Sequence, residues 1–175
     1  MKILAISGSI RSESSNSALL KAIRNLLDKN IKWSDFKINE LPFFDPQIQF
    51  GFGVPLSVQS FRCLAQECDY IILSSPEYAH GIPGILKNAL EWLICEETMK
   101  KKVVVFVASP SGGDYVKEYL LETLRTMDLK VNGEMIFVIR SARKDITMSG
   151  EILNHNLKFS IMEFLKTSGL TLKHW

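Results

Sequence analysis

Cysteine is scarce in this sequence, which contains only Cys63, Cys68 and Cys95. An odd number of cysteines at these spacings matches neither a disulfide framework nor a zinc site. The Cys-x-x-Cys spacing of a redox-active pair is also missing between Cys63 and Cys68. We therefore predict three buried thiols that behave as small hydrophobic side chains in a reducing compartment.

Long apolar runs and an excess of charge of one sign are also absent. No apolar run approaches the ~20 residues that a membrane-spanning helix needs. Met1-Lys2 leads directly into a short apolar run, without the longer apolar segment of a signal peptide. The formal net charge is only +2, and no basic stripe of the kind found in nucleic-acid-binding proteins is present. We expect a cytoplasmic protein that binds neither membranes nor nucleic acid.

Apolar runs alternate with segments of helical period along the whole chain. The predicted strands are residues 2–7, 31–38, 70–75, 103–108 and 134–139, and the predicted helices are 19–27, 57–68, 83–93, 116–127 and 151–168. The strongest strands are apolar throughout, which is typical of a parallel sheet covered on both faces. We predict one α/β domain spanning residues 1–175, a flavodoxin-like three-layer sandwich with a five-stranded parallel sheet in the order 2-1-3-4-5.

Three polar loops follow the first, third and fourth predicted strands. They are residues 8–16, 76–82 and 109–114. Ligands of open α/β sheets bind at the carboxyl ends of the strands, where the strand order reverses. We therefore expect these loops to form one site.

The first loop is rich in groups that bind phosphate. It offers a guanidinium, an amide and several hydroxyls: Arg11, Asn16, Ser9, Ser12, Ser14 and Ser15. Its backbone N–H groups lead into the beginning of a helix, which favours an anion. The loop lacks both the P-loop ending and the Gly-x-Gly-x-x-Gly dinucleotide pattern, so a single phosphate monoester fits better than a pyrophosphate. The alternative is a capped turn with a surface arginine.

The second loop combines an aromatic ring with backbone donors. Tyr78 can stack on a flat heteroaromatic ligand, whose carbonyl groups would accept hydrogen bonds from the backbone between Glu77 and His80. As alternatives, Tyr78 is a half-buried packing residue, and His80 is a surface histidine rather than a proton relay. In the third loop, Gly112-Gly113 allows a close approach to a ligand or only turns the chain.

These motifs resemble those of the NADPH-dependent FMN reductase family. The segment GSIRSESSN is similar to its phosphate loop, PEYAHGIPGILKNALEW to its central motif, and SPSGG to its third loop. The resemblance implies that FMN is the cofactor, with its phosphate at Ser9, Arg11, Ser14, Ser15 and Asn16. It places the isoalloxazine ring at Pro76, Glu77, Tyr78, Ala79, His80 and Gly81, and closes the other side with Ser109, Ser111 and Gly112. Many family members have Asn at the position of Ala79.

The same resemblance implies an FMN-dependent NAD(P)H oxidoreductase. Hydride would pass from NADPH or NADH to the flavin and then to a quinone, azo compound, metal oxyanion or free flavin, without a catalytic side chain or a metal. The family also implies a homodimer or homotetramer, for which the aromatic loop 43–52 is a candidate interface or pocket wall. One alternative is a flavodoxin-like electron carrier without efficient NAD(P)H oxidation; another is a regulatory protein that has lost the flavin.

Overall fold

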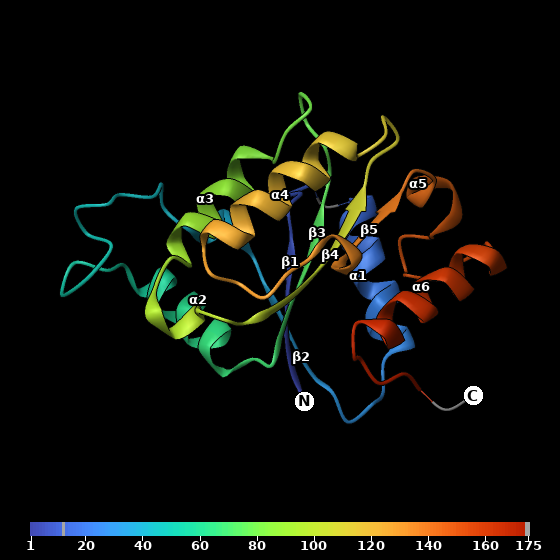
Figure 1. Ribbon diagram of the computed structural model, residues 1–175, viewed down its shortest axis with the longest axis horizontal. Coiled ribbons are helices and arrows are strands. Elements are labelled where there is room, and N and C mark those ends of the chain that lie inside the picture. The colour runs from blue at the N-terminus through green and yellow to red at the C-terminus, as the bar shows by residue number, and fades with distance from the viewer. Residues whose placement is uncertain (12, 174–175) are drawn as a thin grey trace.

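The computed structural model describes residues 1–11 and 13–173, so Ser12 of the predicted phosphate loop lies outside the described residues. Five strands form one sheet: β1 Lys2–Ser7, β2 Lys32–Phe36, β3 Tyr70–Ser75, β4 Lys102–Ala108 and β5 Ile136–Ile139. All neighbouring strands are parallel, in the order β2-β1-β3-β4-β5 (Figure 1). This order confirms the predicted topology, with the weaker strand β2 at one edge.

Helices cover both faces of the sheet. Those in the described residues are α1 Ser15–Leu26, α2 Leu56–Glu67, α3 Gly84–Trp92, α4 Asp114–Thr126, α5 Ala142–Asp145 and α6 His155–Thr167, with short 3₁₀ turns η1 Ile38–Glu40, η2 Glu96–Thr98 and η3 Gly133–Met135. Figure 1 shows α2, α3 and α4 on one face and α1, α5 and α6 on the other. None of the helices in residues 1–11 and 13–173 is long and apolar enough to cross a membrane.

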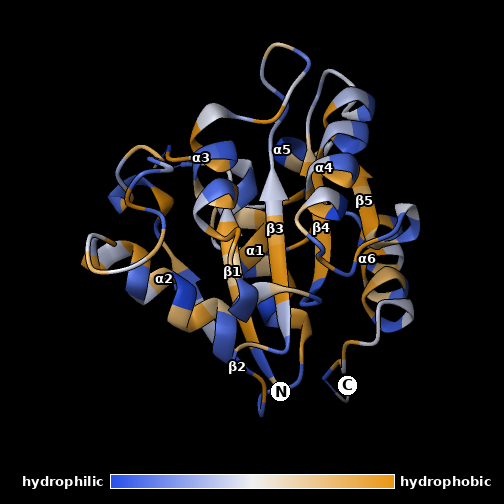
Figure 2. Ribbon diagram, turned by 60° about the vertical axis from the view of Figure 1, so that its left-hand side comes forward, coloured by the Kyte–Doolittle hydropathy of each residue, from blue (hydrophilic) through white to orange (hydrophobic). Residues whose placement is uncertain are grey.

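Two apolar cores lie between the layers, one on each face of the sheet. Phe61 of α2 and Leu90 of α3 belong to one core, and Ile23 of α1 and Ile161 of α6 belong to the other. Every residue of β3 is buried, and the strands are mostly hydrophobic, whereas the helices carry polar residues on their outer faces (Figure 2). Trp92 of α3 is also fully buried.

Several element boundaries differ from the sequence prediction. The last helix begins at His155 rather than at residue 151, because Asn154 caps it by accepting hydrogen bonds from the N–H groups of Asn156 and Leu157. Helix α5 lies between the last two predicted helices, where the sequence analysis placed no helix. Helix α4 begins at Asp114 rather than at residue 116, with Gly113 in the N-cap position.

The cysteines do not share one environment, so the prediction of three buried thiols is wrong for Cys63, which is exposed on α2. Cys68 and Cys95 are buried, and burial raises the pKa of both thiols. These two groups therefore remain as unreactive thiols at neutral pH, because the thiolate is the reactive form.

We expect iodoacetamide to alkylate only Cys63 rapidly in the native protein, and all three cysteines after unfolding in denaturant. Intact mass and peptide mass spectrometry measure the sites and their rates. The Cys63→Ser variant should lose the fast reaction and keep its thermal stability. Equal native rates at Cys63 and Cys68 would contradict the burial described above.

Candidate functional site

The three predicted loops meet at the carboxyl edge of the sheet and line one cavity of about 330 Å³. Ten of the predicted site residues line it: Ser9, Arg11, Ser14, Ser15, Asn16, Pro76, Glu77, Tyr78, Ser109 and Ser111. The other four, Ala79, His80, Gly81 and Gly112, belong to the same loops but are not among the lining residues. The sheet topology therefore brings together segments that are far apart in the sequence.

Helix α1 directs its N-terminus toward this cavity. The backbone N–H of Asn16 donates to Ser14 Oγ at 3.1 Å, so Ser14 is the N-cap residue. The first N–H groups of a helix have no partners within the helix and carry the positive end of its dipole. Together with the guanidinium of Arg11, they make this end of the cavity suitable for a phosphate.

Asn16 connects the first loop to the central strand. Ser74 Oγ donates a hydrogen bond of 2.9 Å to Asn16 Oδ1, and both side chains are buried. This bond fixes the orientation of the Asn16 side chain, whose amide nitrogen is the group that can donate to a ligand.

The second loop contains a tight two-residue turn. Tyr78 and Gly81 exchange backbone hydrogen bonds of 3.2 and 2.9 Å. Between them, Ala79 and His80 have φ angles of 49° and 57°. Such primed turns prefer Asn-Gly, because both central residues need positive φ. This chain has Ala-His instead, so the turn is strained.

Glu77 and Tyr115 hold the strained turn through His80. The Nδ1 atom of His80 lies 3.1 Å from Oε1 of Glu77, and the side chain of Glu77 is only 2% exposed. The His80 ring also packs edge-on against Tyr115 of α4, at a centroid distance of 4.7 Å. His80 is therefore a surface histidine, in agreement with the alternative given above, and its contacts with Glu77 and Tyr115 restrict its orientation.

The third loop is shaped by glycine. Gly113 has φ of 94°, and a Cβ atom at this position would lie 2.8 Å from Val107 Cγ1. The loop therefore stays close to the sheet, and it places the buried Ser109 with its Oγ 2.9 Å from Ser111 Oγ. Both residues line the cavity.

Sequence reasoning missed two basic residues of the cavity, Arg140 and Arg143. They follow β5, so a systematic reading of every segment after a parallel strand would have found them. Arg140 Nη2 also lies 3.3 Å from Asp114 Oδ2 in an exposed ion pair. Arg143 comes from α5, the short helix that the sequence prediction did not include.

The cavity fits the chemical groups of FMN. Three of its lining residues are arginines, and Glu77 is the only acidic one among them, which suits a phosphate dianion. The half-exposed ring of Tyr78 can stack on a flat ring system. Glu77 Oε2 is buried without a hydrogen-bond partner among the described residues, so it can accept a hydrogen bond from a ligand hydroxyl or N–H.

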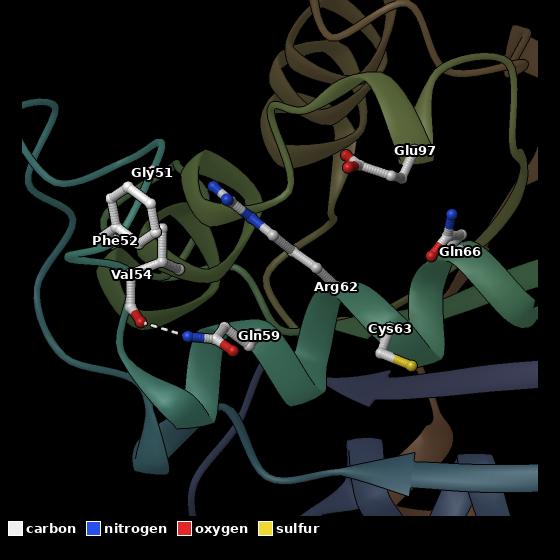
Figure 3. A pocket seen from close by; sticks show the side chains of 8 residues that line it. All are labelled: Gly51, Phe52, Val54, Gln59, Arg62, Cys63, Gln66 and Glu97. Carbon is white, nitrogen blue, oxygen red and sulfur yellow. Dashed lines mark hydrogen bonds between the residues drawn. The ribbon is translucent and has the colours of Figure 1, made fainter.

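Another hollow, of about 490 Å³, lies beside α2. Figure 3 shows Arg62 and Glu97 beside this hollow, where the side-chain amide of Gln59 donates a hydrogen bond to the carbonyl oxygen of Val54. None of the predicted site residues lines this hollow. Arg62 stabilises the fold by donating to the backbone carbonyl oxygens of Trp92 and Gln49, at 2.7 and 2.8 Å.

No group of acidic, histidine or cysteine side chains in residues 1–11 and 13–173 could hold a metal ion.

Replacement of Ala79 tests the strain in the turn. Ala79→Asn should raise the free energy of unfolding by about 0.5–1 kcal/mol, part of the 1–2 kcal/mol that a left-handed residue costs. Ala79→Val should lower it, because a β-branched side chain tolerates positive φ less well than alanine. Denaturant unfolding of the purified variants measures both changes. Equal stability of the two variants would show that the turn is not strained.

Comparison with known proteins agrees with this geometry. The NADPH-dependent FMN reductase family matches residues 1–144. A NAD(P)H-dependent FMN reductase of Pseudomonas aeruginosa is 27% identical over 178 residues, covering 99% of this chain and 96% of that protein. A quinone reductase of Escherichia coli is 24% identical over 144 residues, covering 79% of this chain and 77% of that protein.

The fold is also similar to a solved flavoenzyme structure. FerB, a NAD(P)H:(acceptor) oxidoreductase from Paracoccus denitrificans, aligns with a TM-score of 0.82 and 19% identity, covering 95% of this chain and 94% of that one. This likeness supports the flavodoxin-like architecture. Because the family match covers most of the sequence and includes the segments that line the cavity, the chain belongs to the NADPH-dependent FMN reductase family and is an FMN-dependent NAD(P)H oxidoreductase.

Proposed function

We propose that the cavity at the carboxyl edge of the sheet binds FMN, and that a quinone is the class of acceptor that the bound flavin reduces. The observation that carries this proposal is the meeting of an anion-binding helix N-terminus and an exposed tyrosine in one cavity. The quinone reductase among the relatives supports the choice of acceptor. In this proposal, residues 1–175 form a single flavin-binding domain, and the protein acts in the cytoplasm.

The protein's own groups have distinct roles in this proposal. Arg11, Ser14 and the first N–H groups of α1 bind the phosphate, and the amide of Asn16 donates at the same end. The turn at 78–81 and Ser109 lie on either side of the isoalloxazine ring. Bound FMN supplies the hydride chemistry, whereas these residues bind the cofactor, orient it and exclude water.

An electron-carrier function is less consistent with the charge of the chain. Carriers that dock on basic partners are usually strongly acidic, whereas this chain has a net charge of +2. The rate of NAD(P)H oxidation separates the two functions, because a carrier would bind FMN and react slowly with the nicotinamide.

We also propose that loop 41–55 forms an interface between two copies of this chain. Polar anchors hold the loop against α3: the indole N–H of Trp92 and the amide of Asn88 both donate to Pro42 O at 2.9 Å, and the backbone N–H of Phe44 donates to Asn88 Oδ1 at 2.7 Å. The loop extends from the body of the molecule (Figure 1).

Apolar side chains cover the outer surface of this anchored loop. Phe43 and Phe52 are fully or almost fully exposed, at 92% and 111%, and Phe50 is exposed at 65%. Leu56, the first residue of α2, adds a further apolar side chain beside the loop, at 79%. An ordered loop that presents several large apolar groups to solvent is typical of a protein interface. We choose a second copy of the chain as the partner, because the family resemblance implies dimers or tetramers.

The purified protein should be yellow, and it should bleach when NADPH is added without oxygen and recover its colour when a quinone follows. Arg11→Gln should weaken FMN binding about tenfold or more, because it removes a charge-assisted hydrogen bond. Absorbance and FMN titration measure these effects. Arg125→Gln, an exposed arginine on α4, is the charge-matched control and should bind FMN normally. A colourless protein that ignores added FMN would refute the proposal.

The oligomeric state tests the role of the aromatic loop. The wild-type chain should be a dimer or larger in light scattering after size-exclusion chromatography. The Phe43→Asp/Phe52→Asp variant should be a folded monomer, because two buried carboxylates would face one another across the interface. Phe159→Asp, at an exposed site of α6, is the matched control. A monomeric wild type at micromolar concentration would exclude this interface.

A further inference from the structure

A second polar groove lies beside the flavin cavity, between α1 and β2. It has a volume of about 490 Å³ and shares Ser9 and Arg11 with the flavin cavity. Its walls come from α1, from β2 and from the segment that follows β2. We call it the α1–β2 groove. Because β2 is the edge strand, this groove lies at the end of the sheet opposite β5.

Positive charge is concentrated in the α1–β2 groove. Its ionisable lining residues are four cations and one carboxylate, namely Arg11, Lys21, Arg24, Lys37 and Asp35. These residues leave a net charge of +3, which exceeds the +2 of the whole chain. The groove is therefore locally basic although the protein is nearly neutral.

The cations of the groove are only weakly neutralised by the protein. Arg24 Nη1 lies 3.9 Å from Asp35 Oδ2, and both side chains are more than half exposed. An exposed pair at this distance contributes little free energy. Lys21 Nζ donates to the backbone carbonyl oxygen of Met148 at 3.1 Å, which orients the ammonium group without cancelling its charge. These groups remain able to bind an anionic ligand.

Trp33 supplies an aromatic surface in the same groove. Its indole N–H donates to Asp35 Oδ1 at 2.9 Å, and the side chain is neither fully buried nor fully exposed. The hydrogen bond satisfies the polar end of the ring and restricts its orientation. A planar base can stack on such a ring, in a manner that needs no specific hydrogen bonds.

We propose that the α1–β2 groove binds the adenosine 2′-phosphate portion of NADPH, with the adenine against Trp33 and the 2′-phosphate against Lys21 and Arg24. The combination of an aromatic ring with several cations matches a nucleoside phosphate better than a simple anion. Arg11 lies between the two sites, so one dinucleotide could extend from the groove toward the flavin. This assignment rests on the proposed function, since it concerns the hydride donor of that reaction, and it predicts a preference for NADPH over NADH.

Calorimetric titration of the FMN-loaded protein with 2′-AMP, 5′-AMP and inorganic phosphate tests this assignment. The 2′-AMP should bind more tightly than either of the other two. Arg24→Gln should weaken 2′-AMP binding about tenfold, the value of one charge-assisted hydrogen bond, and should lower the ratio of kcat/KM for NADPH to that for NADH. Trp33→Leu should weaken both nucleotides and leave phosphate binding unchanged.

Lys29→Gln is the matched control, because Lys29 is an exposed cation between α1 and β2 that does not line the groove. It should bind 2′-AMP like the wild type. Equal affinity for 2′-AMP and inorganic phosphate would show a general anion site, and wild-type 2′-AMP affinity in Arg24→Gln would place the phosphate elsewhere. Either result would overturn the assignment.

Flavin content separates failure of this inference from failure of the proposed function. A protein that holds FMN and oxidises NADH, but binds 2′-AMP no better than phosphate, would refute only the α1–β2 groove. A protein without flavin would refute the proposed function. Once FMN is bound, the 2′-AMP titration measures binding to the α1–β2 groove directly and does not depend on turnover.

Discussion

The buried hydrogen bond between Ser74 and Asn16 fixes the geometry of the cavity at the carboxyl edge of the sheet. It joins the end of β3 to the first turn of α1, and the N–H of Gly8 adds a backbone bond of 2.7 Å to Ser74 O. A Cβ atom at residue 8 would lie 2.9 Å from Leu86 Cδ2 and 3.3 Å from Ser74 O, so the tight packing at this point favours glycine. Since a buried polar group that loses its partner costs about 1–3 kcal/mol, the N-terminus of α1 and the second loop, residues 76–82, cannot easily move apart.

Because these bonds hold the end of β3 in place, the loop that follows β3 can contain a strained turn at its tip. Two successive residues with side chains, Ala79 and His80, have positive φ, and such positions persist only where the surroundings fix them. Here the surroundings are the buried carboxylate of Glu77 and the ring of Tyr115, which both contact His80. The backbone donors of the turn are consequently held in place before any ligand binds. Such preorganisation reduces the entropy that a ligand would otherwise lose on ordering the loop.

The sequence was sufficient to predict the sheet order, because uninterrupted apolar strands separated by helical segments leave few parallel arrangements. It also identified most of the residues that line the cavity, since three chemically rich loops follow three strands of that sheet. It did not identify Arg140, which directly follows β5, because the segment after that strand was not considered as part of the site. It did not identify Arg143, because a short helix such as α5 has no clear periodicity. The exposure of Cys63 was missed for a related reason: it depends on which face of α2 packs on the sheet, and a weakly amphipathic helix leaves that choice to tertiary contacts.

Positive charge in this protein is concentrated in one region, whereas the net charge of the whole chain is small. Basic residues surround the carboxyl end of β1, with Arg11 between the flavin cavity and the α1–β2 groove, while the whole chain is close to neutral. A concave site lined by one sign of charge attracts an oppositely charged ligand even when the net charge is small. The fold can therefore attract phosphorylated small molecules to one edge of its sheet although its net charge is close to zero.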